Sequence, residues 1–143
     1  MKINRSASAA WAGGLRDGKG SITTESGALS AYPYGFASRF EGVKGTNPEE
    51  LLGAAHAGCF TMALSLILGE AKFTAEQMDT SAKVTLEQVD GGFAITAVHL
   101  TLKAKIPGID QATFEELTTK AKAGCPVSKV LKAAITLDAS LVS

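Results

Sequence analysis

The hydrophobic pattern of the first forty residues predicts short strands separated by glycine-rich turns. Lys2 to Trp11 is predicted to form a strand, "AGGLRDGKG" is a turn, and "SITTES" is β-prone. The stretch "YGFASRF" also alternates and predicts a strand. One face of that strand would carry Tyr34, Phe36, Ser38 and Phe40, and the other Ala37 and Arg39.

A long apolar helix is predicted to follow, beginning at Pro48 and ending near Gly69. Thr46 or Asn47 can cap it, proline suits its first position, and the acidic pair after Pro48 complements the helix dipole. This helix is apolar on nearly all sides, and a small domain rarely covers such a helix completely. We therefore expect a homodimer with the helix at or near the interface.

The remaining chain predicts two strands, two helices and a last strand. Asp79 to Val89 and Phe93 to Ile106 alternate on either side of a "DGG" turn. "DQATFEELTTKAKAG" is an amphipathic helix, "PVSKVLKAA" is a shorter one, and "ITLDASL" is the final strand. The pattern predicts a single α+β domain over residues 1–143 with mostly antiparallel strands.

The balance of charged residues limits the kinds of partner that the protein is expected to bind. Fourteen basic residues balance fourteen acidic ones without a basic run, so nucleic acid and anionic membrane surfaces are not expected partners. The N-terminus lacks a secretory signal pattern. Leu51 to Leu68 is short for a membrane span and holds polar side chains, so no span is expected. We expect a cytoplasmic protein whose two cysteines are reduced thiols or a working redox pair.

Cys59 lies near the middle of the apolar helix, where it is either a small core residue or a nucleophile. Burial raises the pKa of a thiol, so a reactive Cys59 needs a cation at close range. Arg39 is a candidate, and Glu49 could hold its guanidinium through two hydrogen bonds. Both also have structural interpretations, Arg39 on a solvated strand face and Glu49 as a partner of the helix dipole.

Cys125 has a different setting. "AGCPVSKV" places it directly before a proline that starts a helix, where a thiolate is favoured and the thiol is expected to be exposed enough to attack another sulfur. It is otherwise a loop cysteine without a role. The sequence does not indicate whether Cys59 and Cys125 meet in space.

Other candidate sites have less support. His56, Cys59, His99 and Cys125 together contain zinc-ligand residue types, but their spacing resembles no zinc finger or ribbon. His56 is more readily a packed or hydrogen-bonded histidine near the site. "GGLRDGKG" imitates a phosphate-binding loop, but glycine follows its lysine and a β-prone stretch replaces the helix. We expect no metal.

Two motifs carry a resemblance to a known family. "GTNPEELLGAAHAGCF" followed by "KAGCPVS" resembles the OsmC/Ohr family of thiol peroxidases, and in particular its OsmC (osmotically inducible protein C) branch. "PYGFASRFEGVKGTNPEEL", "FTMALSL", "IPGID" and "AITLD" are also similar to that branch. The resemblance covers essentially the whole chain. It implies an OsmC-like fold, with antiparallel sheets around a long central apolar helix in an intertwined homodimer.

The resemblance also implies a chemistry. Cys59 matches the peroxidatic cysteine, Cys125 the resolving cysteine, Glu49 the carboxylate that holds the catalytic arginine, and Arg39 that arginine. Arg16 and Arg5 are alternatives, because the Ohr branch places its arginine nearer the N-terminus. The implied reaction reduces organic hydroperoxides, and more weakly hydrogen peroxide, through a Cys59 sulfenic acid that Cys125 resolves as a disulfide.

The resemblance implies an external reductant, a small dithiol or a lipoylated protein, and no haem, flavin or metal cofactor. Stress-induced expression is a family expectation. Tyr32 and Tyr34 are candidates for shaping an apolar substrate pocket. Two other functions are weighed against the peroxidase. One is a redox sensor that switches through the same disulfide, and the other is a binding module for an apolar ligand.

Overall fold

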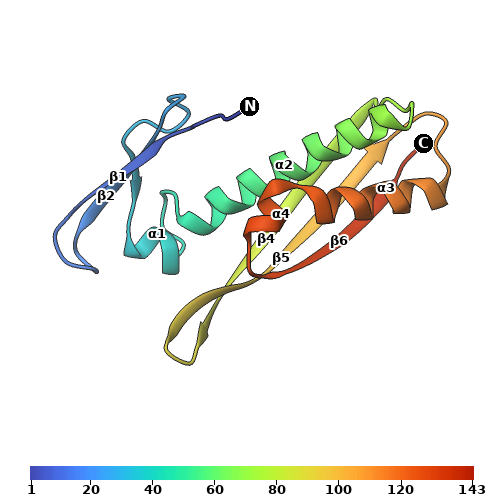
Figure 1. Cartoon of the computed structure of the whole chain (residues 1–143). Helices are drawn as coiled ribbons and strands as arrows, with labels where there is room; N and C mark the ends of the chain where they lie inside the picture. The colour runs from blue at the N-terminus through green and yellow to red at the C-terminus, as the bar shows by residue number, and fades with distance from the viewer. The chain divides into compact units, whose positions relative to one another are not determined.

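The computed structural model describes residues 1–143, and the chain forms two compact units, Met1–Leu51 and Leu52–Ser143. Each unit contains a three-stranded sheet (Figure 1). The protein is therefore of the predicted α+β class, whereas the single domain over 1–143 stays a prediction.

The first unit is a small antiparallel sheet with strand order β1-β2-β3. Its strands are β1 (Ala7–Ala12), β2 (Lys19–Thr24) and β3 (Tyr32–Tyr34). Trp11 and Tyr34 flank Gly20 across the sheet, with ring centroids 5.6 Å apart. A Cβ at Gly20 would lie 2.6 Å from both rings, so only glycine lets the two aromatic side chains meet there.

The predicted strand over "YGFASRF" is wrong beyond Tyr34. Residues Phe36–Phe40 form a short helix, α1, rather than an extended segment. The Ser38 hydroxyl accepts from the Gly35 N–H at 2.9 Å and lies 2.9 Å from the Thr46 carbonyl, which favours the turn over a strand. Phe36 and Phe40 are four residues apart, so they share a helix face as well as a strand face, and their rings lie 5.0 Å apart.

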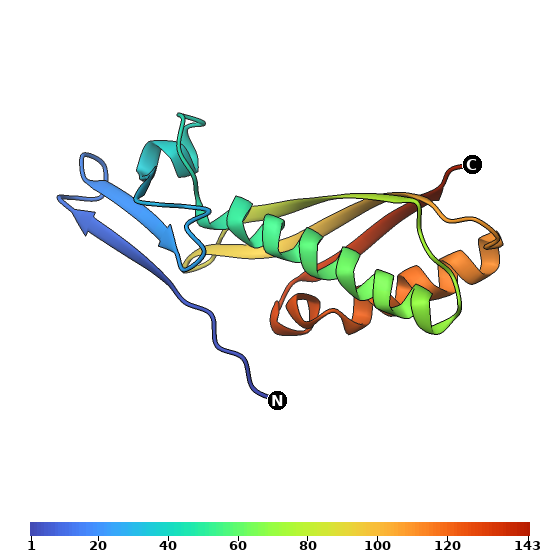
Figure 2. The ribbon, with the colours of Figure 1, turned by 90° about the horizontal axis from the view of Figure 1, so that it is seen from above.

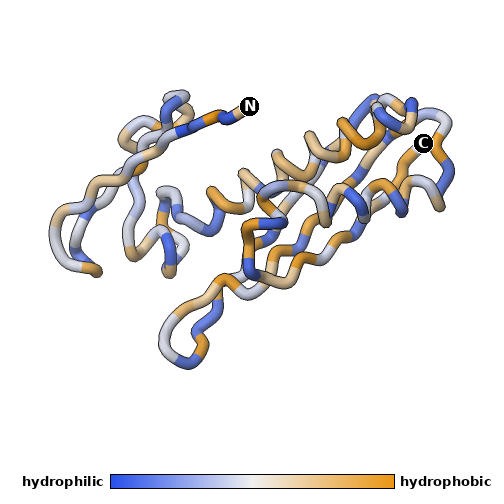
Figure 3. Tube along the Cα trace, in the orientation of Figure 1, coloured by the Kyte–Doolittle hydropathy of each residue, from blue (hydrophilic) through white to orange (hydrophobic).

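Helix α2 (Pro48–Glu70) is the long apolar helix that the sequence predicts, and it extends one residue past Gly69. Of the two predicted caps, Asn47 acts as one, because its side-chain oxygen accepts from the Glu50 N–H at 2.8 Å. Thr46 instead donates its hydroxyl to the Glu50 carboxylate. Apolar residues follow one another along most of the helix (Figure 3).

The second unit packs helices against one face of a sheet with strand order β4-β5-β6 (Figure 2). Besides most of α2, it contains β4 (Gln77–Val89), β5 (Gly92–Lys105), α3 (Gln111–Gly124), α4 (Pro126–Val130) and β6 (Ala134–Leu141). Strands β4 and β5 form the predicted antiparallel hairpin. The strands are mostly antiparallel, as predicted, and the exception is β6, which pairs parallel to β5. Helices α3 and α4 carry the chain back across the sheet before β6, and such a crossover gives a parallel pair.

The core of the second unit lies between α2, α3 and the sheet. The predicted inward face of β5 and its extension is buried throughout, and it comprises Val98, Leu100, Leu102, Ala104 and Ile106. Phe60, Leu64 and Leu68 from α2 and Phe114 from α3 complete this cluster. Gly53 brings α2 close to β4, since a Cβ there would be 3.5 Å from the Ala82 carbonyl oxygen.

Helix α2 is long and apolar enough to cross a membrane by length and composition alone. Within the chain, 28% of its apolar window is buried. The core helix of a soluble protein meets the same criterion, and so does a helix that a second chain covers.

Candidate active site

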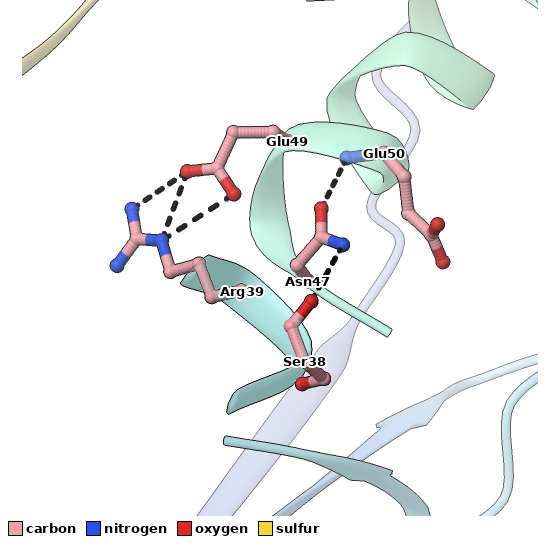
Figure 4. A network of polar contacts seen from close by, with 5 residues as sticks. All are labelled: Ser38, Arg39, Asn47, Glu49 and Glu50. Atoms are coloured by element: carbon pink, nitrogen blue, oxygen red, sulfur yellow. Dashed lines mark hydrogen bonds and ion pairs between the residues drawn. The ribbon is translucent and has the colours of Figure 1, made fainter. Parts of the chain in front are cut away.

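Arg39 and Glu49 form an ion pair within the first unit (Figure 4). Glu49 Oε1 lies 2.7 Å from Arg39 Nη2 and 3.0 Å from Nε, and Oε2 lies 3.3 Å from Nε. The Glu49 side chain is 12% exposed and the Arg39 side chain 36%. The pairing agrees with the expected contact, but Arg39 reaches it from helix α1 rather than from a strand.

The local structure explains how the pair is held. The Asn47 amide lies 3.4 Å from the Ser38 carbonyl of α1, while its side-chain oxygen caps α2. Glu49 therefore leaves the first turn of α2 next to the short helix that carries Arg39 (Figure 4). The guanidinium also lies 5.4 Å from the ring centroid of Phe40, which is 40% exposed. The site presents one oriented cation beside an aromatic surface.

The two cysteines meet in the second unit. Cys59 on α2 is partly buried, Cys125 lies between α3 and α4, and the two side chains belong to one core cluster, where each thiol shifts the pKa of the other. Pro126 begins α4 as predicted, and Cys125 Sγ caps that helix by accepting from the Ser128 N–H at 3.3 Å. The expectation that Cys125 is exposed is wrong, because it is buried with 0% exposure at the α3–α4 corner.

The surroundings shift the pKa values of the two thiols in opposite directions. Burial raises the pKa of Cys59, and the Cys125 charge and hydrogen bond raise it further, against a hydrogen bond from the Val127 N–H. Burial also opposes ionisation of Cys125, but hydrogen bonds from Ser128, Cys59 and Val127 outweigh it and lower its pKa. The thiolate is thus favoured on Cys125, and no cationic side chain contributes to the pKa of Cys59.

His56 lies one helical turn before Cys59 and is fully buried. Its Nε2 is 2.7 Å from Ser128 Oγ, and its Nδ1 has no hydrogen-bond partner. The sequence-based interpretation of His56 as a packed, hydrogen-bonded histidine near the site is confirmed. Burial lowers the pKa of His56, which favours the neutral imidazole.

Sequence reasoning missed Ser128. A signal was present, because Ser128 stands three residues after Cys125, the spacing at which a capping side chain accepts the backbone N–H. Its contact with His56 joins residues 72 positions apart and had no sequence signal.

Several other candidates lie elsewhere. His99 contacts Thr136 and Asp138 on β6 and is not grouped with the cysteines. Among the alternative arginines, Arg16 stacks 4.6 Å above the Phe36 ring, and Arg5 hydrogen-bonds to the Asn4 carbonyl. Tyr32 and Tyr34 bound strand β3.

The family model described as "OsmC-like protein" matches residues 41–140 of the chain. The chain belongs to the OsmC family. It is 59% identical over 143 residues to "Peroxiredoxin OsmC" of Escherichia coli (strain K12), with full coverage of both chains. It is 32% identical over 101 residues to an "Organic hydroperoxide resistance protein" of Xanthomonas axonopodis pv. citri, covering 70% of this chain and 69% of that protein.

Solved structures of the OsmC family have the same fold. The crystal structure of an organic hydroperoxide resistance protein from Elizabethkingia anophelis matches with a TM-score of 0.73 and 28% identity. The match covers 99% of this chain and 100% of that chain. The family predicted from the two cysteine motifs is confirmed.

Proposed function

We propose that this OsmC-family chain is a peroxidase that reduces organic hydroperoxides with Cys59 as the attacking thiol and Cys125 as the resolving thiol. The observation that carries this proposal is the proximity of the two thiols, which come from α2 and the α3–α4 corner and lie close enough for each to shift the pKa of the other. Its relatives include a peroxiredoxin and organic hydroperoxide resistance proteins, which supports the same reaction class.

The two thiols supply the electrons that reduce the peroxide, and an external dithiol restores them. The Cys59 thiolate attacks the distal oxygen of the hydroperoxide, the O–O bond breaks, and the departing alkoxide takes a proton to become an alcohol. Cys59 is then a sulfenic acid. Cys125 attacks its sulfur, a disulfide forms, and the oxygen leaves as water. A dithiol or lipoyl-type reductant reopens the disulfide by thiol exchange. These steps require no metal or cofactor.

Cys59 needs a cation to react, since burial and Cys125 both raise its pKa. The Arg39 guanidinium, oriented by Glu49, can stabilise both the Cys59 thiolate and the charge on the leaving oxygen. Glu49 lies in the first turn of α2 and Cys59 ten residues further on, which is about 15 Å of rise along a helix. That spacing favours an arrangement in which the ion pair of one copy serves Cys59 of a second copy.

A homodimer would also cover the exposed side of α2. Met62 is 76% exposed and Leu66 66% exposed on the single chain, four residues apart on one side of the helix. A second copy of the same helix offers the matching apolar surface. The aromatic surface of Phe40 beside Arg39 suits the organic part of a hydroperoxide better than hydrogen peroxide. A cytoplasmic location fits the reduced thiols.

One alternative uses the same observation. A redox sensor also needs two thiols in contact, with the disulfide changing its partners instead of turning over. Steady-state reduction of cumene hydroperoxide with dithiothreitol distinguishes the two, because a sensor is oxidised once and an enzyme turns over.

The test compares wild type with Cys59→Ser and Cys125→Ser. We expect turnover by wild type, no peroxide reduction by Cys59→Ser, and a single oxidation of Cys59 in Cys125→Ser in the absence of reductant. Stoichiometric oxidation of wild type without turnover would favour the sensor. Undiminished turnover by Cys59→Ser would overturn the assignment of Cys59.

A further inference from the structure

Ser128 contacts both His56 and Cys125. The proposed reaction does not explain why His56 is buried there, or why the surroundings of Cys125 favour its thiolate. Its Oγ lies 2.7 Å from His56 Nε2, and its N–H donates to Cys125 Sγ at 3.3 Å. The Ser128 side chain is also close enough to the Cys125 thiol to lower its pKa. Ser128 therefore lies between the imidazole and the resolving sulfur.

The direction of these hydrogen bonds follows from the unpartnered atom of His56. Nδ1 is buried without a partner, so a proton there would create a buried N–H with no acceptor. Burial also lowers the pKa of His56. The imidazole is therefore neutral and carries its proton on Nε2. It donates to Ser128 Oγ, which leaves the serine hydroxyl proton free to point at Cys125 Sγ.

We propose that His56 and Ser128 form a hydrogen-bond chain that holds Cys125 as a thiolate for attack on the Cys59 sulfenic acid. In this chain Ser128 is a catalytic residue, because it contacts the reacting sulfur, and His56 is a positioning residue that acts through Ser128. The inference rests on the proposed peroxidase function, and specifically on its second step.

The step is balanced without a further reactant. The Cys125 thiolate attacks Cys59 Sγ, the S–S bond forms and the S–O bond breaks. The leaving hydroxide takes a proton from solvent and becomes water. The electron pair of the thiolate forms the new bond, so Cys125 is oxidised and the Cys59 sulfur is reduced from sulfenic acid to disulfide. Ser128 and His56 undergo no net change.

The hydrogen-bond chain assists the second half-reaction and not the first. Formation of the Cys59 sulfenic acid depends on Cys59 and its cation, whereas its conversion to the disulfide depends on the nucleophilicity of Cys125. Loss of the Ser128 hydroxyl should therefore slow disulfide formation and lengthen the lifetime of the sulfenic acid. A purely structural role for the contact would instead disturb both steps together, with a loss of stability.

The experiment follows a single turnover with cumene hydroperoxide in the absence of reductant. Peroxide loss reports the first step, and trapping with dimedone followed by mass spectrometry reports the surviving sulfenic acid. For Ser128→Ala we expect peroxide loss at least as fast as in wild type, because a protonated Cys125 no longer adds a charge that raises the pKa of Cys59. We expect disulfide formation about 10- to 100-fold slower, the range for one hydrogen bond to a charged group. Ser128→Thr, which keeps the hydroxyl, should restore the rate. Ser65→Ala removes an exposed hydroxyl of α2 and serves as the matched control.

A double-mutant cycle tests the positioning role of His56. His56→Gln should slow disulfide formation alone, and adding it to Ser128→Ala should have no further effect on that rate. Wild-type rates of disulfide formation in Ser128→Ala would overturn the inference, as would equal slowing of both steps. Failure of wild type to consume peroxide would instead overturn the proposed function, so the two failures are distinguishable.

Discussion

Replacing Glu49 with glutamine tests whether the ion pair with Arg39 sets the rate of peroxide reduction. The change preserves the size of the side chain but removes its charge and one of its two acceptor oxygens. Glu49 now accepts from both Nε and Nη2 of Arg39, at 3.0 and 2.7 Å. Glutamine offers one oxygen, and its amide N–H groups oppose the guanidinium donors. The arginine would lose its fixed orientation.

The magnitude follows from this geometry. A hydrogen bond to a charged group contributes about 1.5–3 kcal/mol. The Glu49 end is nearly buried, but the Arg39 side chain is 36% exposed, so water replaces part of what is lost. We therefore take the low end of the range, about 1.5 kcal/mol, which corresponds to a fall of about tenfold in kcat/KM.

The assay is steady-state reduction of cumene hydroperoxide with dithiothreitol. Glu50→Gln is the matched control, because it removes the same charge from the same helical turn, where Glu50 contacts Thr46 and not Arg39 (Figure 4). Its kcat/KM should stay within about twofold of wild type, as expected for a surface substitution. Adding Glu49→Gln to Arg39→Ala should cause little further loss, because the carboxylate acts through the arginine.

Equal activity of Glu49→Gln and wild type would refute this reasoning. A similar loss in Glu50→Gln would also refute it, because the effect would then belong to the charge of the helix terminus and not to the ion pair.

Three further predictions concern the thiols, the core and the exposed side of α2. Cys125→Ala removes the charge and hydrogen bond that raise the pKa of Cys59, so alkylation of Cys59 by iodoacetamide should begin at lower pH than in wild type. An unchanged or higher pH would contradict this. Phe60→Ala should lower the free energy of unfolding by about 3–5 kcal/mol in urea titrations, because Phe60 is fully buried, and a loss below about 1 kcal/mol would be inconsistent with that packing. Met62→Lys should shift the mass measured by light scattering toward a monomer, since it would bury an unpaired charge in the proposed interface. If the variant stays a stable dimer, the face of α2 that carries Met62 is not the dimer interface.

The sequence predicts best those elements that bury one face and expose the other. The face of β5 from Val98 to Leu102 is readable because every second residue meets the core, and the start of α2 is readable from Asn47 and Pro48. Helix α1 is not readable in this way, because Phe36 and Phe40 fall on one face under either period. The parallel pairing of β6 depends on the path of α3 and α4, which periodicity does not encode.

The contacts of the candidate site likewise fall into those that the sequence predicts and those that it does not. The Arg39–Glu49 pair follows from complementary residue types ten positions apart, and the structure brings them together. The contact of Cys59 with Cys125 depends on tertiary packing, as does the contact of His56 with Ser128. Such contacts have no periodic signature, so their chemistry emerges only from the fold.

The position of Cys125 at the α3–α4 corner has a consequence for the resistance of the protein to unfolding during turnover. A bond between Cys59 and Cys125 would close a covalent loop of about 66 residues, and a loop of this length stabilises a folded chain by about 4 kcal/mol in the chain-entropy description. Each proposed cycle would thus alternate a cross-linked form with an open one. The molecule would resist unfolding most in the interval between meeting a peroxide and meeting its reductant, when oxidants are in excess.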